Sequence, residues 1–259
     1  MHNSAFRALK INARYVLFEK RPDEVEQFLK QLAKRGIKGL NVTFPYKEKV
    51  FTLLGKRVSP SARVIGAVNT ITVAKNGSLR GYNTDCLGFA KHLKQLKVKP
   101  KKVALIGAGG AAKAVCFALA TSGTPEITIY DIDRFKSLSL VKHFRHIFVN
   151  THFLAVGQAD DLALAKKDLL VNASPVGMHE QDPCLVSPDA LHQGLFVYDL
   201  IYNPTETKLL TLAQARGLSC ANGLGMLLHQ GAEAFSIWMK PKKAPVEVMR
   251  KALEEALKQ

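Results

Sequence analysis

The sequence predicts an α/β fold with two domains. Most segments alternate between apolar strand patterns and amphipathic helix patterns, which is typical of α/β proteins. A strand, a glycine-rich turn and a helix follow one another from Val103, after a basic, proline-containing connector at residues 97–102. We place the domain boundary near residue 85, because the helix expected there precedes this new βαβ unit.

In the first half, the pattern predicts a strand at residues 13–18 and a helix at 22–35, which has Pro22 in its first turn and Gly36 just past its end. A short strand is expected at 39–42. Asn76-Gly77 is a strong two-residue turn signal, so residues 68–73 and 78–82 are expected to form a hairpin. A helix over 84–96 follows, with Thr84 as its N-cap.

In the second half, apolar strands are expected at 103–106, 126–130, 169–172 and 196–200. A helix follows the glycine turn to about Ser122 and ends at Gly123. Three further helices are expected at 207–216, 225–239 and 245–257.

Composition narrows the class of protein. The chain has 259 residues, of which 47% are hydrophobic, and no apolar run reaches the ~18 residues of a membrane helix. The start of the chain has no secretory apolar region. The four cysteines are scattered, which argues against a disulfide framework or a metal cluster. We therefore expect a cytoplasmic protein without a metal site or a membrane segment.

The net charge of +16 raises the question of nucleic acid. However, the lysines are spread out, and no interleaved aromatic residues mark a base-stacking surface. We expect no nucleic-acid partner. A positive field also suits a phosphate-bearing cofactor and an anionic small molecule.

The most informative motif is the glycine turn, which fits G-x-G-x-x-A. Gly107 allows the tight turn, Gly109 lets the backbone approach a pyrophosphate, and Ala112 lets the helix pack closely on the strand. The helix N-terminus adds N–H groups and a positive dipole end. The motif predicts a bound dinucleotide.

Asp131 lies 24 residues after Gly107, at the end of the next strand. A carboxylate there can accept both ribose hydroxyls of NAD and would repel the 2′-phosphate of NADP. The next residue is Ile132, not a cation that would bind this phosphate. The residues therefore favour NAD, with NADP as the alternative if Arg134 binds the 2′-phosphate.

Polar residues follow several strands of the first half. Lys47 follows Asn41-Val42-Thr43-Phe44-Pro45-Tyr46, and Asp85 ends Gly-Tyr-Asn-Thr-Asp. Oxidation of an alcohol needs a group that takes the hydroxyl proton as hydride leaves. A lysine beside an acid can do this. On chemistry alone, these residues are candidates only.

Seven motifs in this order resemble the shikimate dehydrogenase family over essentially the whole chain: NVTFPYK, AVNT, GYNTD, GAGGAAKA, NASPVGM, DLIYNP and NGLGMLLHQGAEAF. The resemblance implies reversible hydride transfer between shikimate and 3-dehydroshikimate, a step in chorismate and aromatic amino acid biosynthesis. It also implies a substrate domain at residues 1–84, to which 226–259 return, and a Rossmann-like NAD(P) domain at 85–225. A monomer or a homodimer is expected.

The resemblance also assigns roles. Lys47 and Asp85 would be the catalytic pair, and substrate would be bound by Thr43, Asn69, Tyr202 and Gln230. The pyrophosphate would lie on Gly107, Ala108, Gly109, Gly110 and Ala111, with Asp131 at the ribose and Leu200 and Gly223 near the nicotinamide.

The chain departs from the family pattern at two places. Most NADP-using members carry Asn-Arg-Thr where this chain has Asp131-Ile132-Asp133, which resembles the NAD-using branch that also accepts quinate. In addition, the family has a first strand and a Ser-x-Ser segment before the equivalent of His2-Asn3, and these serines bind the substrate carboxylate. This sequence starts at Met1. A truncated active relative is therefore one expectation, and a dinucleotide-binding relative without turnover is the alternative.

Overall fold

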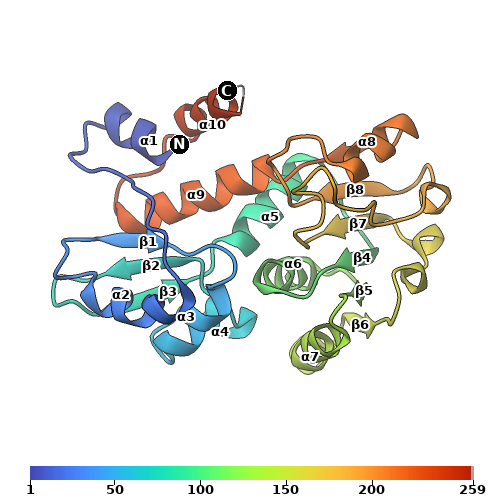
Figure 1. Cartoon of the computed structure of the whole chain (residues 1–259), viewed down its shortest axis with the longest axis horizontal. Helices are drawn as coiled ribbons and strands as arrows, with labels where there is room; N and C mark the ends of the chain where they lie inside the picture. The colour runs from blue at the N-terminus through green and yellow to red at the C-terminus, as the bar shows by residue number, and fades with distance from the viewer. Residues whose placement is uncertain (258–259) are drawn as a thin grey trace. The chain divides into compact units, whose positions relative to one another are not determined.

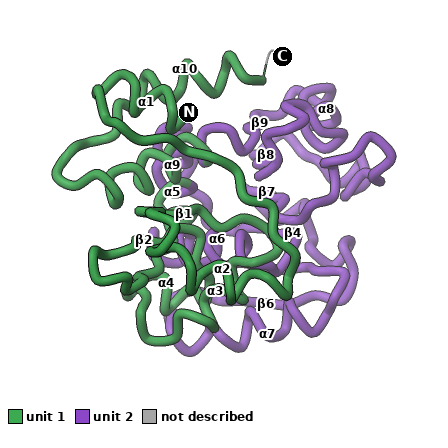
Figure 2. The backbone as a smooth tube through the Cα atoms, turned by 60° about the vertical axis from the view of Figure 1, so that its left-hand side comes forward, with its two compact units in different colours: residues 1–88, 227–259 green, residues 89–226 purple. Residues whose placement is uncertain are grey.

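The computed structural model describes residues 1–257. The chain divides into two compact units, one formed by residues 1–88 and 227 onward, the other by residues 89–226 (Figure 2). The chain passes between them inside two helices, α5 (Asp85–Gln95) and α9 (Leu224–Trp238). The α/β class predicted from the sequence is confirmed.

Unit 1 contains a three-stranded antiparallel sheet in the order β1-β2-β3 (Figure 1). The strands are β1 (Gly39–Asn41), β2 (Thr70–Val73) and β3 (Leu79–Tyr82). The predicted hairpin joins β2 to β3. Gly77 adopts φ +81° in its turn, a conformation that a glycine adopts without strain, and the Ala74 N–H donates to the Ser78 carbonyl at 2.9 Å.

Apolar residues of three helices pack on this sheet. The helices are α2 (Val25–Gln31), which follows the 3₁₀ turn η1 (Pro22–Glu24), α3 (Lys47–Leu54) and α4 (Pro60–Ile65). Their shared core includes Phe28, Leu32, Val50, Ala62 and Ile71. A second core joins α1 (His2–Ala8), α9 and α10 (Val246–Ala256), through Phe6, Phe235 and Met249 among others. The helix expected at residues 22–35 is shorter in the structure. The 3₁₀ turn η1 is followed by α2, which ends at Gln31.

The strand predicted at residues 13–18 is wrong. These residues belong to no strand of the structure. The Asn3 amide takes both backbone groups of Tyr15, because its Oδ1 accepts from the Tyr15 N–H at 2.6 Å and its Nδ2 donates to the Tyr15 carbonyl at 2.9 Å. Leu17 is 81% exposed. An apolar segment makes a strand only where a neighbouring strand pairs with it.

Unit 2 contains a six-stranded parallel sheet in the order β6-β5-β4-β7-β8-β9. The strands are β4 (Lys102–Ile106), β5 (Glu126–Tyr130), β6 (His152–Ala155), β7 (Leu169–Asn172), β8 (Phe196–Asp199) and β9 (Cys220–Ala221). Numbered within this sheet, the order is 3-2-1-4-5-6, the order of a Rossmann fold. Its switch point lies beside β4, where ligands bind in such sheets.

Helices cover both faces of the parallel sheet, which explains why its strands are apolar throughout. α6 (Gly110–Thr121) and α7 (Arg134–Arg145) lie on one face (Figure 1). α8 (Lys208–Ala215) packs Leu209 and Leu210 into a core with Ala104, Ile106 and Val197. Short 3₁₀ turns complete the unit: η2 (Asp160–Leu162), η3 (Leu164–Lys166) and η4 (Pro188–Ala190).

Two features of the fold bear on the function classes considered above. Within residues 1–257, no helix combines the length and the apolar character that crossing a bilayer requires. The same residues contain no cluster of three or more His, Cys, Asp or Glu side chains arranged to hold a metal ion. Cys86 and Cys116 are buried, and burial raises the pKa of the Cys86 thiol to about 12.

Candidate active site

Three segments of unit 1 meet at the ends of its strands. The Val42 N–H donates to the Asn69 carbonyl at 2.8 Å, and the Asn69 N–H donates to the Tyr82 carbonyl at 3.0 Å. The loop after β1 therefore lies beside the residue before β2, and that residue lies beside the end of β3. Lys47 begins α3 and Asp85 begins α5 just beyond these contacts.

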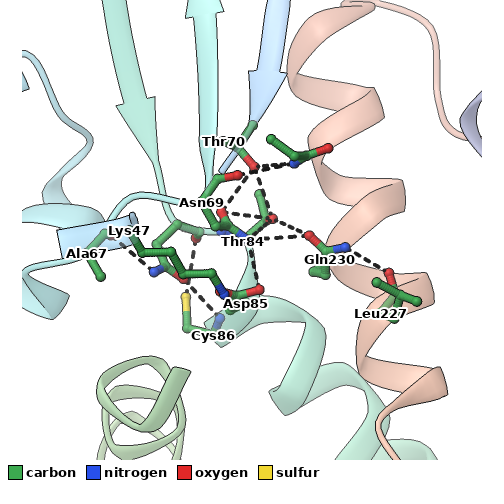
Figure 3. Close-up of polar contacts among 11 residues, drawn as sticks. Lys47, Ala67, Asn69, Thr70, Thr84, Asp85, Cys86, Leu227 and Gln230 are labelled. Atoms are coloured by element: carbon green, nitrogen blue, oxygen red, sulfur yellow. Dashed lines mark hydrogen bonds and ion pairs between the residues drawn. The ribbon is translucent and has the colours of Figure 1, made fainter. Parts of the chain in front are cut away.

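The sequence-predicted pair is in contact. The Lys47 Nζ lies 2.7 Å from the Asp85 Oδ2, although 38 residues separate the two along the chain (Figure 3). The side chains are 18% and 7% exposed, so the pair is largely withdrawn from water and Lys47 is the more exposed of the two. A bond between a charged donor and a charged acceptor in such surroundings is strong and fixes both side chains.

Asn69 fixes the other face of the carboxylate. Its Nδ2 donates to the Asp85 Oδ1 at 2.8 Å, and it also lies 3.0 Å from the Thr84 Oγ1 and 3.3 Å from the Gln230 Oε1. Its Oδ1 accepts from the Thr84 N–H at 2.8 Å. Asn69 is 2% exposed. Both oxygens of Asp85 are thus engaged, one by Lys47 and the other by Asn69.

Gln230 reaches this cluster from α9, far along the chain. Its Oε1 also lies 3.3 Å from the Thr84 Oγ1, and its Nε2 donates to the Leu227 carbonyl at 3.1 Å (Figure 3). The bond to Leu227 orients the amide, so that the Gln230 oxygen is directed at Asn69 and Thr84. The structure therefore brings together four of the predicted site residues of unit 1: Lys47, Asn69, Asp85 and Gln230.

The sequence reasoning missed two members of the cluster. Thr70 and Thr84 are fully buried, and their hydroxyl oxygens lie 3.3 Å apart. The Thr70 hydroxyl also donates to the Asn69 Oδ1 at 3.0 Å. Both threonines stand in the motifs AVNT and GYNTD, but their hydroxyls were not assigned a role. In the structure Thr84 is not the side-chain cap of α5, because the Asn83 Oδ1 accepts from the Cys86 N–H at 3.3 Å.

Thr43 differs from the other predicted residues of unit 1. It lies in the loop between β1 and α3 and is exposed. Among the described residues, the bonds that join the cluster do not include its side chain. Tyr202 belongs to unit 2, in the loop after β8, and is 41% exposed. Roles for Thr43 and Tyr202 stay predictions.

The glycine turn of unit 2 has the predicted local geometry. Gly107 adopts φ +101°, and a Cβ at this position would lie 2.9 Å from the backbone of Ala173. Gly107 is therefore required by both conformation and space. A Cβ at Gly109 would meet nothing within 4 Å, so open space lies in front of this residue.

The start of α6 fits a dinucleotide pyrophosphate. Gly109 is the N-cap, and no side chain among the described residues caps this helix. Its first N–H groups, at Gly110 and Ala111, therefore remain available to an anion at the positive end of the helix dipole. Ala108 donates its N–H to the Asp131 Oδ2 at 2.7 Å, which joins the turn to the end of β5.

Asp131 is already part of the turn. Its other oxygen accepts from the Asp133 N–H at 2.8 Å. Each carboxylate oxygen has a second lone pair, so the side chain keeps acceptor capacity for ribose hydroxyls. The Lys136 ammonium lies 3.6 Å from the Asp133 carboxylate at the first turn of α7.

Two family models match the chain. The shikimate dehydrogenase substrate-binding domain matches residues 1–71, and the shikimate 5′-dehydrogenase C-terminal domain matches residues 223–254. A curated relative from Methanopyrus kandleri, named shikimate dehydrogenase (NADP(+)), is 40% identical over 265 residues, which covers all of this chain and 90% of the relative. The chain belongs to the shikimate dehydrogenase family.

Solved structures of shikimate dehydrogenases agree with this assignment. One, in complex with NADP⁺, superposes with a TM-score of 0.90 at 35% identity and covers 100% of this chain and 90% of its own. Another, from Listeria monocytogenes in complex with shikimate and NAD, has a TM-score of 0.86 at 33% identity and covers 97% and 90%. The family resemblance inferred from the seven motifs is confirmed.

Proposed function

We propose that this protein is a shikimate dehydrogenase that interconverts shikimate and 3-dehydroshikimate by hydride transfer with a nicotinamide dinucleotide. The observation that carries the proposal is the Lys47–Asp85 ion pair, which Asn69 holds in place in this chain of the shikimate dehydrogenase family. In the oxidation, the dinucleotide takes a hydride from the carbinol carbon. The protein must take the hydroxyl proton, so that the C–O bond becomes a carbonyl.

Lys47 and Asp85 supply this proton acceptor. An ammonium carries three N–H donors, so the bond to Asp85 leaves donors that bind the substrate oxygen. In the oxidation, Lys47 passes one of its N–H protons to the Asp85 carboxylate and its ε-nitrogen takes the hydroxyl proton, so the pair gains one proton; in the reverse direction the Lys47 ammonium gives a proton to the carbonyl oxygen and takes one back from Asp85. The Asn69 amide keeps the carboxylate in place while the charge on the pair changes.

We assign most of the substrate-binding residues to unit 1 and dinucleotide binding to unit 2. Asn69 and Gln230 present amide groups beside the pair, and Thr43 and Tyr202 are further substrate residues on the family pattern. Gly107 to Ala111 hold the pyrophosphate. Leu200 and Gly223 line the nicotinamide end, where a Cβ at Gly223 would clash with the Leu200 carbonyl.

For the dinucleotide we propose NAD. The Asp131 carboxylate stands at the end of β5, and Ile132, which is 94% exposed, follows it. A carboxylate disfavours a nearby 2′-phosphate by charge repulsion. The names of the curated relatives, which specify NADP(+), give the competing expectation. In that case Arg134 would bind the 2′-phosphate.

The first test compares Lys47→Ala with Lys49→Ala. Both lysines lie in α3, but the Lys49 ammonium donates to the Pro22 carbonyl, away from the cluster. We expect K47A to lower kcat by at least about 100-fold, as loss of a general acid–base does, with dinucleotide affinity kept. K49A should match the parent chain. Equal turnover in K47A and the parent chain would remove Lys47 from the mechanism.

The second test measures kcat/KM for NAD and NADP, each with shikimate and with quinate. We expect NAD to be preferred by at least about tenfold, which corresponds to about 1.4 kcal/mol of differential binding. Quinate is included because Asp131-Ile132-Asp133 resembles the NAD-using branch of the family, which also accepts quinate. A strong NADP preference would refute the interpretation of Asp131 and leave the rest of the proposal intact.

The alternative is a relative that binds a dinucleotide but has no turnover. It predicts that NADH binds while shikimate is not oxidised at any concentration. The complete cluster of Lys47, Asp85, Asn69 and Gln230 favours the enzyme. Measurable oxidation of shikimate by the parent chain would exclude the alternative.

A further inference from the structure

Two buried polar side chains stand next to each other at the carboxyl ends of β7 and β8. Asn172 and Asp199 are paired in the register of the parallel sheet, and both are fully buried. The Asn172 Nδ2 donates to the Asp199 Oδ1 at 3.0 Å. Neither residue belongs to the acid–base cluster. Burial of a carboxylate is costly, which calls for an explanation.

Asp199 uses its two oxygens to hold the loop after β8. Its Oδ1 accepts from the Ile201 N–H at 3.0 Å, and its Oδ2 accepts from the Thr207 hydroxyl at 2.7 Å. The two donors flank Tyr202, so the loop is fixed at its beginning and at its end. Burial raises the pKa of Asp199, and these bonds act in the opposite direction.

Asn172 holds the loop after β7 in the same way. Its Oδ1 accepts from the Ser174 N–H at 3.0 Å and from the Ser174 hydroxyl at 2.7 Å, and its Nδ2 also donates to the Val176 carbonyl at 3.0 Å. The space that a Cβ at Gly107 would fill is bounded by Ala173 and Ser174. The loop after β7 therefore packs directly on the glycine turn.

We propose that Asp199 is a positioning residue that, together with Asn172, sets the two loops that receive the nicotinamide half of the dinucleotide. This inference rests on the proposed function. Leu200, whose N–H donates to the Asn172 carbonyl at 2.9 Å, directly follows Asp199 and packs on Gly223. In the proposed arrangement Asp131 receives the adenosine ribose and the start of α6 receives the pyrophosphate, which leaves the two loops to the nicotinamide half.

The test separates the contribution of the nicotinamide ring from that of the rest of the dinucleotide. We would measure the Kd of NADH, of NADPH and of ADP-ribose, which lacks the nicotinamide, for the parent chain, Asp199→Asn and Thr207→Val. Asp199→Asn keeps the shape of the side chain and replaces one acceptor by a donor. For the tighter-binding dinucleotide we expect the Kd to rise by at least about tenfold in both variants, while the Kd of ADP-ribose stays close to the parent value.

Two further variants serve as controls. Thr207→Ser keeps the hydroxyl and should restore the parent Kd. Thr151→Val removes a buried hydroxyl of the same unit, which donates to the Thr124 carbonyl at 2.8 Å, and should lower the melting temperature without a selective effect on NADH. Thr207→Val gives the same information if Asp199→Asn does not fold.

The outcomes distinguish this inference from the proposed function. The positioning role alone would be overturned by either of two results in Asp199→Asn and Thr207→Val. The Kd values of NADH and ADP-ribose rise equally, or both stay at the parent value. A parent chain that binds dinucleotide but does not oxidise shikimate would overturn the proposed function and leave this test valid. A parent chain that binds neither dinucleotide would overturn both.

Discussion

Asn69 offers two amide hydrogens to three acceptors, the oxygens of Thr84, Asp85 and Gln230. This sharing makes it the residue on which the orientation of the acid depends. Lys47 contacts the other oxygen of Asp85, so a rotation of the carboxylate would move the ammonium as well. The Lys47–Asp85 ion pair is therefore held by a neutral amide, which exchanges no proton in the proposed reaction.

We expect Asn69→Ala to lower kcat/KM for shikimate by about 100-fold, because a misplacement of a catalytic group by about 1 Å has an effect of that size. Steady-state kinetics would measure it. Asn76→Ala is the control, since the side-chain Oδ1 of Asn76 accepts from the Ser78 N–H and the Ser78 hydroxyl within the hairpin turn, away from the cluster. Parent-like kinetics in Asn69→Ala would show that Asp85 needs no such support.

At the scale of elements, the glycine turn shows two different reasons for glycine. Gly107 needs its positive φ and has no room for a Cβ beside Ala173. Gly109 has ordinary dihedral angles and open space in front of it. One position is glycine for the fold, and the other is glycine for the ligand in the proposed function.

Gly107→Ala and Gly109→Ala should therefore behave differently. We expect Gly107→Ala to lower stability by about 2 kcal/mol through backbone strain. Gly109→Ala should keep the parent stability and weaken the binding of NADH, because the added methyl group lies where the pyrophosphate would approach the backbone. Thermal melts and NADH titrations would measure the two effects. Unchanged NADH affinity in Gly109→Ala would contradict the placement of the cofactor.

The sequence predicted the elements whose signals are local. The turn at Asn76-Gly77 fixed the β2–β3 hairpin, and the G-x-G-x-x-A spacing fixed the β4–α6 unit. Residues 13–18 have an apolar pattern as well, but Asn3 takes the backbone groups of Tyr15, and that contact spans 12 residues. A strand forms only when two segments pair, so an apolar pattern in one segment is not sufficient to predict it.

At the scale of the whole molecule, His2 links α1 to the aromatic residues Tyr15 and Trp238, with ring centroids 4.6 and 5.3 Å away. Its Nδ1 is buried and has no hydrogen-bond partner among the residues that the structure describes. Burial, with a smaller contribution from the N-terminal charge, lowers the pKa of the imidazole from 6.5 to about 4. The folded chain therefore keeps His2 neutral under conditions in which the unfolded chain protonates it.

This difference makes stability depend on pH. The unfolded state binds more protons between pH 6.5 and about 4, so the free energy of unfolding falls as pH decreases through that range. His2→Phe keeps an aromatic ring but cannot be protonated. We expect its free energy of unfolding to rise by about 2 kcal/mol relative to that of the parent chain on going from pH 7 to pH 5. Denaturant unfolding at both pH values would measure it. Parallel pH profiles would contradict the prediction.

The site was predictable from sequence to the extent that motifs named its residues. Lys47, Asp85, Asn69 and Gln230 come together as expected, although Gln230 lies 161 residues from Asn69. Thr70, Asn172 and Asp199 were not assigned a role. Their importance depends on burial and on partners from other segments, which a residue's type does not reveal.

The central claim is that the Lys47–Asp85 pair exchanges a proton with the reacting hydroxyl of shikimate. A crystal structure of the protein with shikimate and the dinucleotide bound tests it most directly. We expect this hydroxyl to lie within hydrogen-bond distance, about 3 Å, of the Lys47 Nζ or the Asp85 carboxylate. Shikimate bound away from both groups, or with a different hydroxyl directed at them, would contradict it.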